Sequence, residues 1–281
     1  MKPIVFYKLS GSGNDFIVID NRMKIVDEKD VQNFVVKLCR RKMSVGADGL
    51  ILVENATGVD FKWRFYNSDG SSAQMCGNGA RCVARFACLA GIAGSDMSFE
   101  TGAGIVYARV INDRVKVKLT DPENFMADYT LGLDNSSLSV NSVNTGVPHV
   151  VVFAENMGEN LNDIDVVKLG RQIRFHDQFA PAGTNVNFVC LKQKDALNIR
   201  TYERGVEDET MACGTGAVAA AIVTANKFGI KSPVRVSTKS KGYLNIYFKE
   251  KNGKFFDIYL EGDARVIYKG EIMGDALGSW K

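Results

Sequence analysis

A cysteine followed by Gly-x-Gly-Ala occurs twice in this chain, and each copy runs into an apolar stretch typical of a helix. The first copy is residues 76–80 (CGNGA) and the second is residues 213–217 (CGTGA). Their cysteines are 137 residues apart, and the preceding Tyr66 and Tyr202 are 136 residues apart. A duplication of a whole unit predicts two related halves, each with a cysteine at the start of a helix.

A thiol at a helix start lies among unpaired backbone N–H groups at the positive end of the helix dipole, which favours the thiolate. Two such thiols, Cys76 and Cys213, suggest a site in which one sulfur works on each side of a substrate carbon. The chain has no Cys-x-x-Cys pair and only two histidines, so neither a structural zinc site nor a dithiol redox motif is expected. The other cysteines are interpreted as core residues: Cys39, Cys82, Cys88 and Cys190.

The composition is that of a globular protein, with 281 residues, 46% of them hydrophobic and 24% charged. This length suits one large domain or two of ordinary size. The net charge of +3 comes from interspersed basic and acidic residues, which argues against a nucleic-acid partner. No apolar run predicts a membrane span, and the N-terminal residues 1–8 are interpreted as a first strand rather than a signal peptide. We therefore expect a cytoplasmic protein with reduced thiols.

Each predicted helix is followed by a predicted β-hairpin, because apolar and polar residues alternate on both sides of an Asn-Asp or Asn-Gly turn. The strands are expected at residues 104–110 and 115–119, and again at 243–248 and 255–260. Upstream, residues 13–18 resemble residues 184–189, with an added helix-like segment near residues 30–42 in the first half.

These patterns predict an α+β fold of two pseudo-symmetric domains. Each would be a curved, mostly antiparallel β-sheet or barrel wrapped around a central helix. The expected boundaries are residues 1–121 with a C-terminal segment at about 266–281 for one domain, and residues 122–265 for the other. Pseudo-two-fold packing would place both thiols at the domain interface, where small-molecule clefts are common.

The chemistry that needs two such thiols is inversion of a carbon next to a carboxylate. One ionised group removes the proton from one face, and one protonated group returns a proton to the other. The glycine turns let backbone N–H groups approach the carboxylate closely, which favours the two helix starts as its binding site. The alternative is that both helices are core helices with tight glycine turns and no catalytic role.

Several further motifs extend over nearly the whole chain. They are GSGNDF at 11–16, VGADGL at 45–50, NSDG at 67–70, MCGNGARC at 75–82, PH at 148–149, GTNV at 183–186, YERG at 202–205, ACGTGA at 212–217 and YKGEI at 268–272. At these residues the chain resembles the diaminopimelate epimerase family. The resemblance implies cofactor-independent epimerisation of L,L-diaminopimelate to the meso isomer, with no metal, in lysine and peptidoglycan precursor synthesis. It also implies a homodimer.

The resemblance assigns roles to individual residues. Cys76 and Cys213 are the implied acid–base pair, and His149 and Glu203 are implied to tune the two thiols. The residues implied to bind substrate are Asn14, Asn67, Gly77, Asn78, Asn185, Glu203, Arg204, Gly214 and Thr215. A zwitterionic distal end needs both acceptors and a cation, and an arginine such as Arg204 can bind a carboxylate through two parallel hydrogen bonds. The other histidine, His176, is interpreted as structural.

Three positions depart from the pattern of many family members. Val147 replaces an asparagine before Pro148-His149, Gly49 replaces a glutamine that contacts substrate in some members, and the loop at residues 205–210 is one residue longer than in some members. Two other functions remain open. A proline racemase or hydroxyproline epimerase shares the paired cysteines, although Asn78 and the Glu203-Arg204 pair favour diaminopimelate. A thiol redox sensor that joins Cys76 to Cys213 is the non-enzyme alternative.

Overall fold

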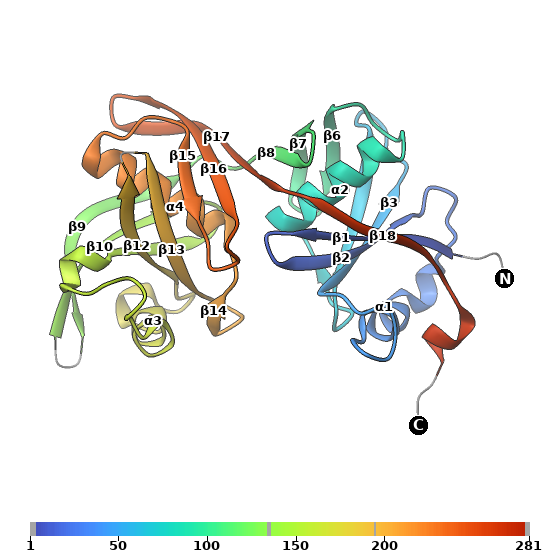
Figure 1. Ribbon diagram of the computed structural model, residues 1–281, viewed down its shortest axis with the longest axis horizontal. Coiled ribbons are helices and arrows are strands. Elements are labelled where there is room, and N and C mark those ends of the chain that lie inside the picture. Colours follow the sequence, from blue (N-terminus) through green and yellow to red (C-terminus); the bar gives the residue numbers. More distant parts are fainter. Residues whose placement is uncertain (1–3, 134–135, 194, 279–281) are drawn as a thin grey trace. The chain divides into compact units, whose positions relative to one another are not determined.

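The structure is a computed structural model that describes residues 4–133, 136–193 and 195–278 (Figure 1). The chain divides into two compact units, which are Met1–Val117 with Gly262–Lys281 (unit 1) and Lys118–Glu261 (unit 2). The two boundaries between the units follow residues 117 and 261, each four residues before the expected boundaries after residues 121 and 265. That the two units are paired catalytic domains stays a prediction. In the part of the chain that is described, no helix is both long and apolar enough to span a bilayer.

Unit 1 is built on one curved sheet, in which β2–β3 and β4–β6 are parallel and the other neighbouring strands are antiparallel. The strands follow one another across the sheet in this order: β18 (Arg265–Ile272), β1 (Ile4–Gly11), β2 (Asn14–Asp20), β3 (Gly49–Glu54), β4 (Phe61–Asn67), β6 (Asp96–Thr101), β7 (Gly104–Ile111) and β8 (Arg114–Lys118). The short β5 (Ser72–Ala73) is added to β4. Helix α2 (Gly77–Leu89) packs against β1, β2, β3, β7 and β18, while α1 (Val31–Cys39) packs against β3 and β4.

Unit 2 repeats this topology. Its strands are β9 (Glu123–Leu133), β10 (Ser136–Asn144), β11 (Pro148–Phe153), β12 (Asn185–Gln193), β13 (Ala196–Glu203), β15 (Val234–Ser237), β16 (Tyr243–Lys251) and β17 (Lys254–Asp263), with β14 (Asp208–Thr210) added to β13. The parallel pairs are β11–β12 and β13–β15. Helix α4 (Gly214–Phe228) packs against β10, β11, β12, β13, β15 and β16, and α3 (Val166–Arg174) packs against β12, β13 and β14. Short 3-10 turns lie at Glu28–Asp30, Ala154–Met157, Asp177–Phe179 and Gly274–Leu277.

The expected fold class is confirmed, as are the two helices after the cysteines and both hairpins. Each hairpin turn has an asparagine with a positive φ, Asn112 at 57° and Asn252 at 54°, a backbone region that asparagine tolerates better than most residues. Residues 1–3 of the expected first strand lie outside the described residues; the rest of it is β1.

One sequence comparison between the halves is wrong. Residues 13–18 overlap β2, whose counterpart by topology is β11, whereas residues 184–189 overlap β12, the counterpart of β3. Helix α1 is also not an addition to the first half, because α3 occupies the same crossover between parallel strands in the second. The matching asparagines align the wrong strands of the two halves. A parallel pair of strands needs a long crossover, and both halves use a helix for it.

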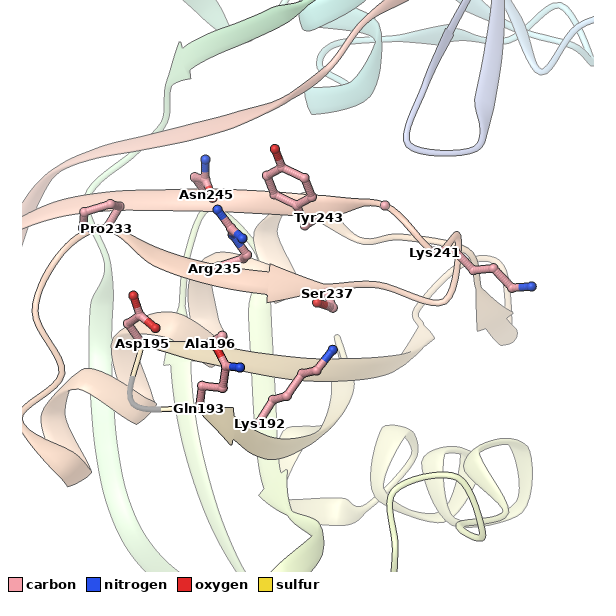
Figure 2. Close-up of a pocket in the computed structure, with 11 residues that line it drawn as sticks. Lys192, Gln193, Asp195, Ala196, Pro233, Arg235, Ser237, Lys241, Tyr243 and Asn245 are labelled. Atoms are coloured by element: carbon pink, nitrogen blue, oxygen red, sulfur yellow. The ribbon is translucent and has the colours of Figure 1, made fainter.

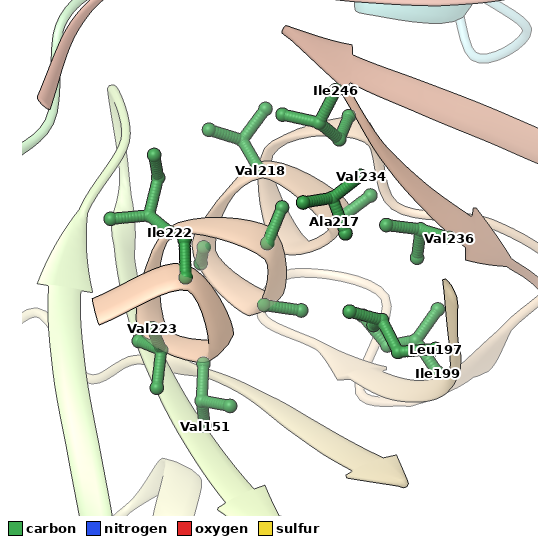
Figure 3. Close-up of a cluster of buried hydrophobic side chains, with 14 of the residues drawn as sticks. Val151, Leu197, Ile199, Ala217, Val218, Ile222, Val223, Val234, Val236 and Ile246 are labelled. Carbon is green, nitrogen blue, oxygen red and sulfur yellow. The ribbon is translucent and has the colours of Figure 1, made fainter. Parts of the chain in front are cut away.

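The central strands beneath the cysteine-bearing helices contribute many buried residues. For example, every residue of β3 is buried, which is typical of a strand covered by helices on both sides. In unit 2, alanines and β-branched residues of α4 form a compact core with neighbouring strands, in which Val218 and Ala217 lie near Ile246 and Val234 (Figure 3). The many small residues let the helix lie close to the sheet, and this fixes the position of its first turn.

Candidate active site

Cys76 is the N-cap of α2. Its backbone is extended (φ −149°, ψ 116°), and its Sγ accepts a hydrogen bond from the Gly79 N–H at 3.4 Å. The thiol is half-buried. An N-cap position places a sulfur among the orphan N–H groups of the first turn, where they stabilise a negative charge. A Cβ on Gly77 would meet nothing within 4 Å, so there is open space beside this turn.

The turn after Cys76 is held by a polar network around Asn78. The Asn78 Nδ2 donates to Asn14 Oδ1 at 2.6 Å, and its Oδ1 accepts from Arg81 Nη2 at 2.9 Å. Arg81 is fully buried and also donates to Ser12 Oγ at 2.7 Å and to the Asp263 carbonyl at 3.2 Å. Burial lowers the pKa of the Arg81 guanidinium, which nevertheless remains a cation at neutral pH. The network therefore places a buried positive charge in the first turns of the helix that carries Cys76.

Asn14 is fixed from its other side by an acidic pair. Its Nδ2 donates to Asp48 Oδ2 at 3.0 Å, and Arg41 bridges Asp48 and Asp15 with hydrogen bonds of 2.8 Å and 2.5 Å. Lys8 adds an ion pair with Asp15 at 2.8 Å. Asn14 and Asn78 are therefore brought together, each with a defined amide orientation.

Two other expected or divergent positions of unit 1, Asn67 and Gly49, lie outside this network. The exposed Asn67 donates from Nδ2 to Ser71 Oγ at 3.0 Å, which fixes it to its own turn at the end of β4. Gly49 lies beneath Phe65, because a Cβ there would be 2.6 Å from the ring atom Cε2 and 2.6 Å from the Tyr66 carbonyl. The departure at Gly49 thus has a steric cause: no side chain fits unless both Phe65 and the Tyr66 backbone move.

Cys213 is the N-cap of α4 with the same geometry (φ −117°, ψ 115°), and its Sγ accepts from the Gly216 N–H at 3.4 Å. The Thr215 hydroxyl lies 3.5 Å from the sulfur. Burial, and then the charge of Glu203, raise the pKa of the Cys213 thiol to about 12, although the contacts with Thr215 and Gly216 oppose this. At neutral pH, Cys213 is therefore a protonated thiol.

The expected distal-end residues of unit 2 gather around Asn185. Its Oδ1 accepts from the Arg204 backbone N–H at 2.9 Å, and its Nδ2 donates to the Pro148 carbonyl at 3.0 Å. The guanidinium of Arg204 donates to the Ala182 carbonyl at 3.2 Å. Burial raises the pKa of the neighbouring Glu203 carboxyl, opposed by the Thr210 hydroxyl. Asn185 thus joins the β11, β12 and β13 backbones at the end that carries Glu203 and Arg204.

His149 is buried at 1% exposure at the start of β11. Burial, and then the charge of Arg204, lower the pKa of its imidazole to about 3, so the ring is neutral. The Nδ1 atom lies 3.0 Å from Asn187 Nδ2, and among the described residues Nε2 has no hydrogen-bond partner. His149 cannot favour a thiolate as an imidazolium in this state, so any effect on a thiol has to come from a hydrogen bond.

The sequence did not single out several residues of these networks. In unit 1 they are Arg81, Ser12 and Asp48; in unit 2 they are Asn187 and Thr145, whose hydroxyl donates to the Thr215 carbonyl at 3.0 Å. One available signal was a polar residue inside an apolar strand, as with Asn187 in NVNFV.

A groove of about 660 Å³ lies over β13, β15 and β16, but none of the expected site residues lines it (Figure 2). Its walls include Lys192, Lys241 and Arg235, whose guanidinium lies 4.6 Å from the centre of the Tyr243 ring. Among the described side chains, no group of three or more His, Cys, Asp or Glu residues is arranged to hold a metal ion.

Comparison with known sequences relates nearly the whole chain to one family. The family model for diaminopimelate epimerase matches residues 6–124 and 141–267. The chain is 46% identical to the diaminopimelate epimerase of Aquifex aeolicus, covering 97% of this chain and 99% of that protein. It is 45% identical to that of a Hydrogenobaculum species, covering 94% and 96%.

Solved structures with similar folds are more distant in sequence. A phenazine biosynthesis protein of the PhzF family from Bacillus anthracis aligns with a TM-score of 0.71 at 17% identity, covering 97% of this chain and all of that one. A probable proline racemase from Agrobacterium radiobacter aligns with a TM-score of 0.69 at 15% identity, covering 98% and 96%. At such identities the likeness shows a shared fold and no more.

Proposed function

This chain belongs to the diaminopimelate epimerase family and is an isomerase, and on that premise we propose that Cys76 and Cys213 are the two acid–base groups that epimerise diaminopimelate. The observation that carries the assignment is that each unit presents its cysteine as the N-cap of a Gly-x-Gly helix. The alternative of two ordinary core helices does not account for why a thiol occupies the cap in both.

The reaction transfers two protons and needs no other co-reactant. A thiolate takes the α-proton, so a C–H bond breaks and an S–H bond forms, and the electron pair spreads onto the adjacent carboxylate. The opposite thiol then gives its proton to the other face of the carbon and becomes a thiolate. The N–H groups of the two helix starts, at Gly77-Asn78 and Gly214-Thr215, stabilise the extra charge on the carboxylate.

The two thiols have unequal surroundings, which supports a defined resting state. Cys213 is buried beside Glu203 and is protonated, so the required thiolate is assigned to Cys76. The buried Arg81 cation in the first turns of α2 favours this assignment. Glu203 thus acts as the tuning group of Cys213, because a nearby negative charge opposes a second one.

The distal amino-acid end of the substrate is assigned to residues that carry both charges and amides. Arg204 supplies a cation for the distal carboxylate, and Glu203 and Asn14 supply acceptors for the ammonium group. Asn67 adds an exposed amide. Asn185 acts mainly by positioning the Arg204 backbone, to which it is hydrogen-bonded.

The decisive experiment uses purified, reduced protein with L,L-diaminopimelate in deuterated water. The meso product is expected to carry deuterium at its α-carbon, and Cys76→Ala and Cys213→Ala are each expected to abolish epimerisation. Full activity in either single variant contradicts the two-base assignment. Proline and hydroxyproline serve as the comparison substrates, because turnover of these alone favours the racemase alternative.

We further propose a cytoplasmic location, because the reaction needs two reduced thiols and that compartment keeps them reduced. If the protein were instead a redox sensor, reversible oxidation of the cysteine pair would be its output and not a loss of its activity. The expected homodimer is tested by light scattering of the purified protein.

A further inference from the structure

The sheet positions beneath the cysteine-bearing helix are apolar in unit 1 and polar in unit 2. Leu50 pairs with Tyr66 in unit 1 as Val186 pairs with Tyr202 in unit 2, so the next pair along each ladder is also equivalent. That next pair is Ile51–Phe65 in unit 1 and Asn187–Thr201 in unit 2.

The third position follows from the parallel ladder beside it. Phe16 pairs with Gly49 in unit 1, as His149 pairs with Asn185 in unit 2. Phe16 and Phe65 form an edge-to-face aromatic pair at 5.9 Å. The fold therefore accepts apolar residues at all three positions, and the polar set of unit 2 is not needed to form the sheet. Burying polar groups is costly, which points to a function for them.

The orientation of the Asn187 amide is fixed by one partner that can only accept a hydrogen bond. Its Nδ2 donates to the Val150 carbonyl at 2.9 Å, and a carbonyl can only accept. Its Oδ1 accepts from the Thr201 hydroxyl at 3.0 Å. A flipped amide would place oxygen against oxygen at Val150.

The tautomer of His149 follows from this orientation. The second Nδ2 hydrogen of Asn187 points to His149 Nδ1 at 3.0 Å, so Nδ1 is an acceptor and the proton of the neutral ring lies on Nε2. The ring is 1% exposed, and Nε2 has no hydrogen-bond partner within the described residues. Such a buried N–H donor is available to an acceptor that arrives with the reaction.

Asn187 also contacts the helix start that carries Cys213. A Cβ on Gly216 would lie 2.4 Å from Asn187 Oδ1, whereas a Cβ on the equivalent Gly79 would meet Ile51 and Trp63 no closer than 3.4 Å. Asn187 therefore lies directly beneath the first turn of α4, in contact with both His149 and the backbone that holds the thiol.

We propose that Asn187 is a positioning residue that holds His149 as the Nε2–H tautomer, so that the ring offers a hydrogen-bond donor to the anionic thiolate or carboxylate of the reaction. The catalytic consequence rests on the proposed function, but the tautomer does not. Burial, and then the charge of Arg204, keep this ring neutral and leave the donor role to Nε2.

The first test is the ¹⁵N spectrum of the histidine rings in the wild-type protein. The chain has only two histidines, and a His176→Gln variant identifies the His149 signals. We expect a protonated Nε2 and an unprotonated Nδ1 for His149 across neutral pH. A protonated Nδ1 overturns the proposal, and this measurement does not depend on any substitution at Asn187.

The second test is Asn187→Asp, which keeps the shape but removes the donor to Nδ1. We expect the ring proton to move to Nδ1, and kcat to fall about 10- to 100-fold with little change in KM, as for loss of a hydrogen bond to a charged group. The new carboxylate raises the pKa of the ring, so the loss is expected above that pKa and should diminish below it, where the ring gains a second proton and Nε2–H returns. Thr201→Val, which leaves both Nδ2 bonds in place, is the matched control and should retain the tautomer.

A double-mutant cycle separates this role from a purely structural one. His149→Gln can present an amide N–H near the former Nε2, so Asn187→Asp or Asn187→Leu should have much less additional effect on kcat in that background. An equal loss in both backgrounds overturns the positioning role. Inactivity of the cysteine variants tests the proposed function separately, because neither variant alters Asn187.

Discussion

At the scale of single residues, the two halves place the same thiol geometry in different electrostatic surroundings. Cys76 shares its turn with the buried Arg81 network, and Cys213 lies beside Glu203. The two cysteine motifs have similar sequences but differently charged surroundings, which suits the proposed pair of one thiolate and one thiol.

Glu203→Gln should lower the pKa of the Cys213 thiol, because it removes a negative charge while burial remains. At a fixed pH near neutrality the thiolate fraction rises, so alkylation of Cys213 by iodoacetamide should become severalfold faster. Peptide mass spectrometry measures this rate, with Cys76 in the same sample as the reference. An unchanged rate at Cys213 would show that Glu203 does not tune it.

Acidification should destabilise the protein through His149. Its pKa is about 3 in the folded protein and 6.5 in the unfolded chain, so the unfolded state takes up a proton first as the pH falls. The contribution of the neutral His149 to the free energy of unfolding is intact above pH 6.5. It is lost between pH 6.5 and about 3, at up to about 1.4 kcal/mol per pH unit. Denaturant unfolding measures the free energy of unfolding of wild type and His149→Gln over this pH range. As the pH falls, the stability of the variant should rise relative to that of the wild type. A constant difference would contradict a buried, neutral ring.

At the scale of elements, each site is a strand–loop–helix start supported by what lies beneath it. Asn78 is fixed by Asn14 and Arg81, while the first turn of α4 is fixed by Thr145 and contacts Asn187. The Gly-x-Gly turns are therefore not equivalent, although their sequences match.

Gly216→Ala and Gly79→Ala form a matched pair that tests this difference. The new methyl group at position 216 would overlap Asn187 Oδ1 at 2.4 Å, whereas at position 79 the contacts are ordinary ones of 3.4 Å or more. We expect Gly216→Ala to lower the free energy of unfolding by about 1–3 kcal/mol and Gly79→Ala to change it little or raise it. Urea unfolding measures both, and equal effects would contradict the steric account.

At the scale of the whole molecule, the family assignment makes diaminopimelate the ligand that should stabilise the folded chain. At 100 times its Kd, a ligand that binds only the folded state adds about 2.7 kcal/mol, which corresponds to a rise in Tm of several degrees. Differential scanning fluorimetry should show this rise with meso-diaminopimelate but not with proline. A rise with proline alone would instead favour the racemase alternative.

The sequence by itself determined the fold class, the duplicated cysteine helices, the hairpins and the family. These features depend on local periodicity, turn chemistry and contiguous motifs. Comparison of the two halves by sequence aligned β2 with β12 and missed the correspondence of α1 with α3. A match between short asparagine motifs carries no information on the order of strands in a sheet. Only the tertiary structure decided that Arg81, Asn187 and Thr201 lie in hydrogen-bonded networks with the residues proposed for the site, because burial and amide orientation arise from contacts between segments far apart in the chain.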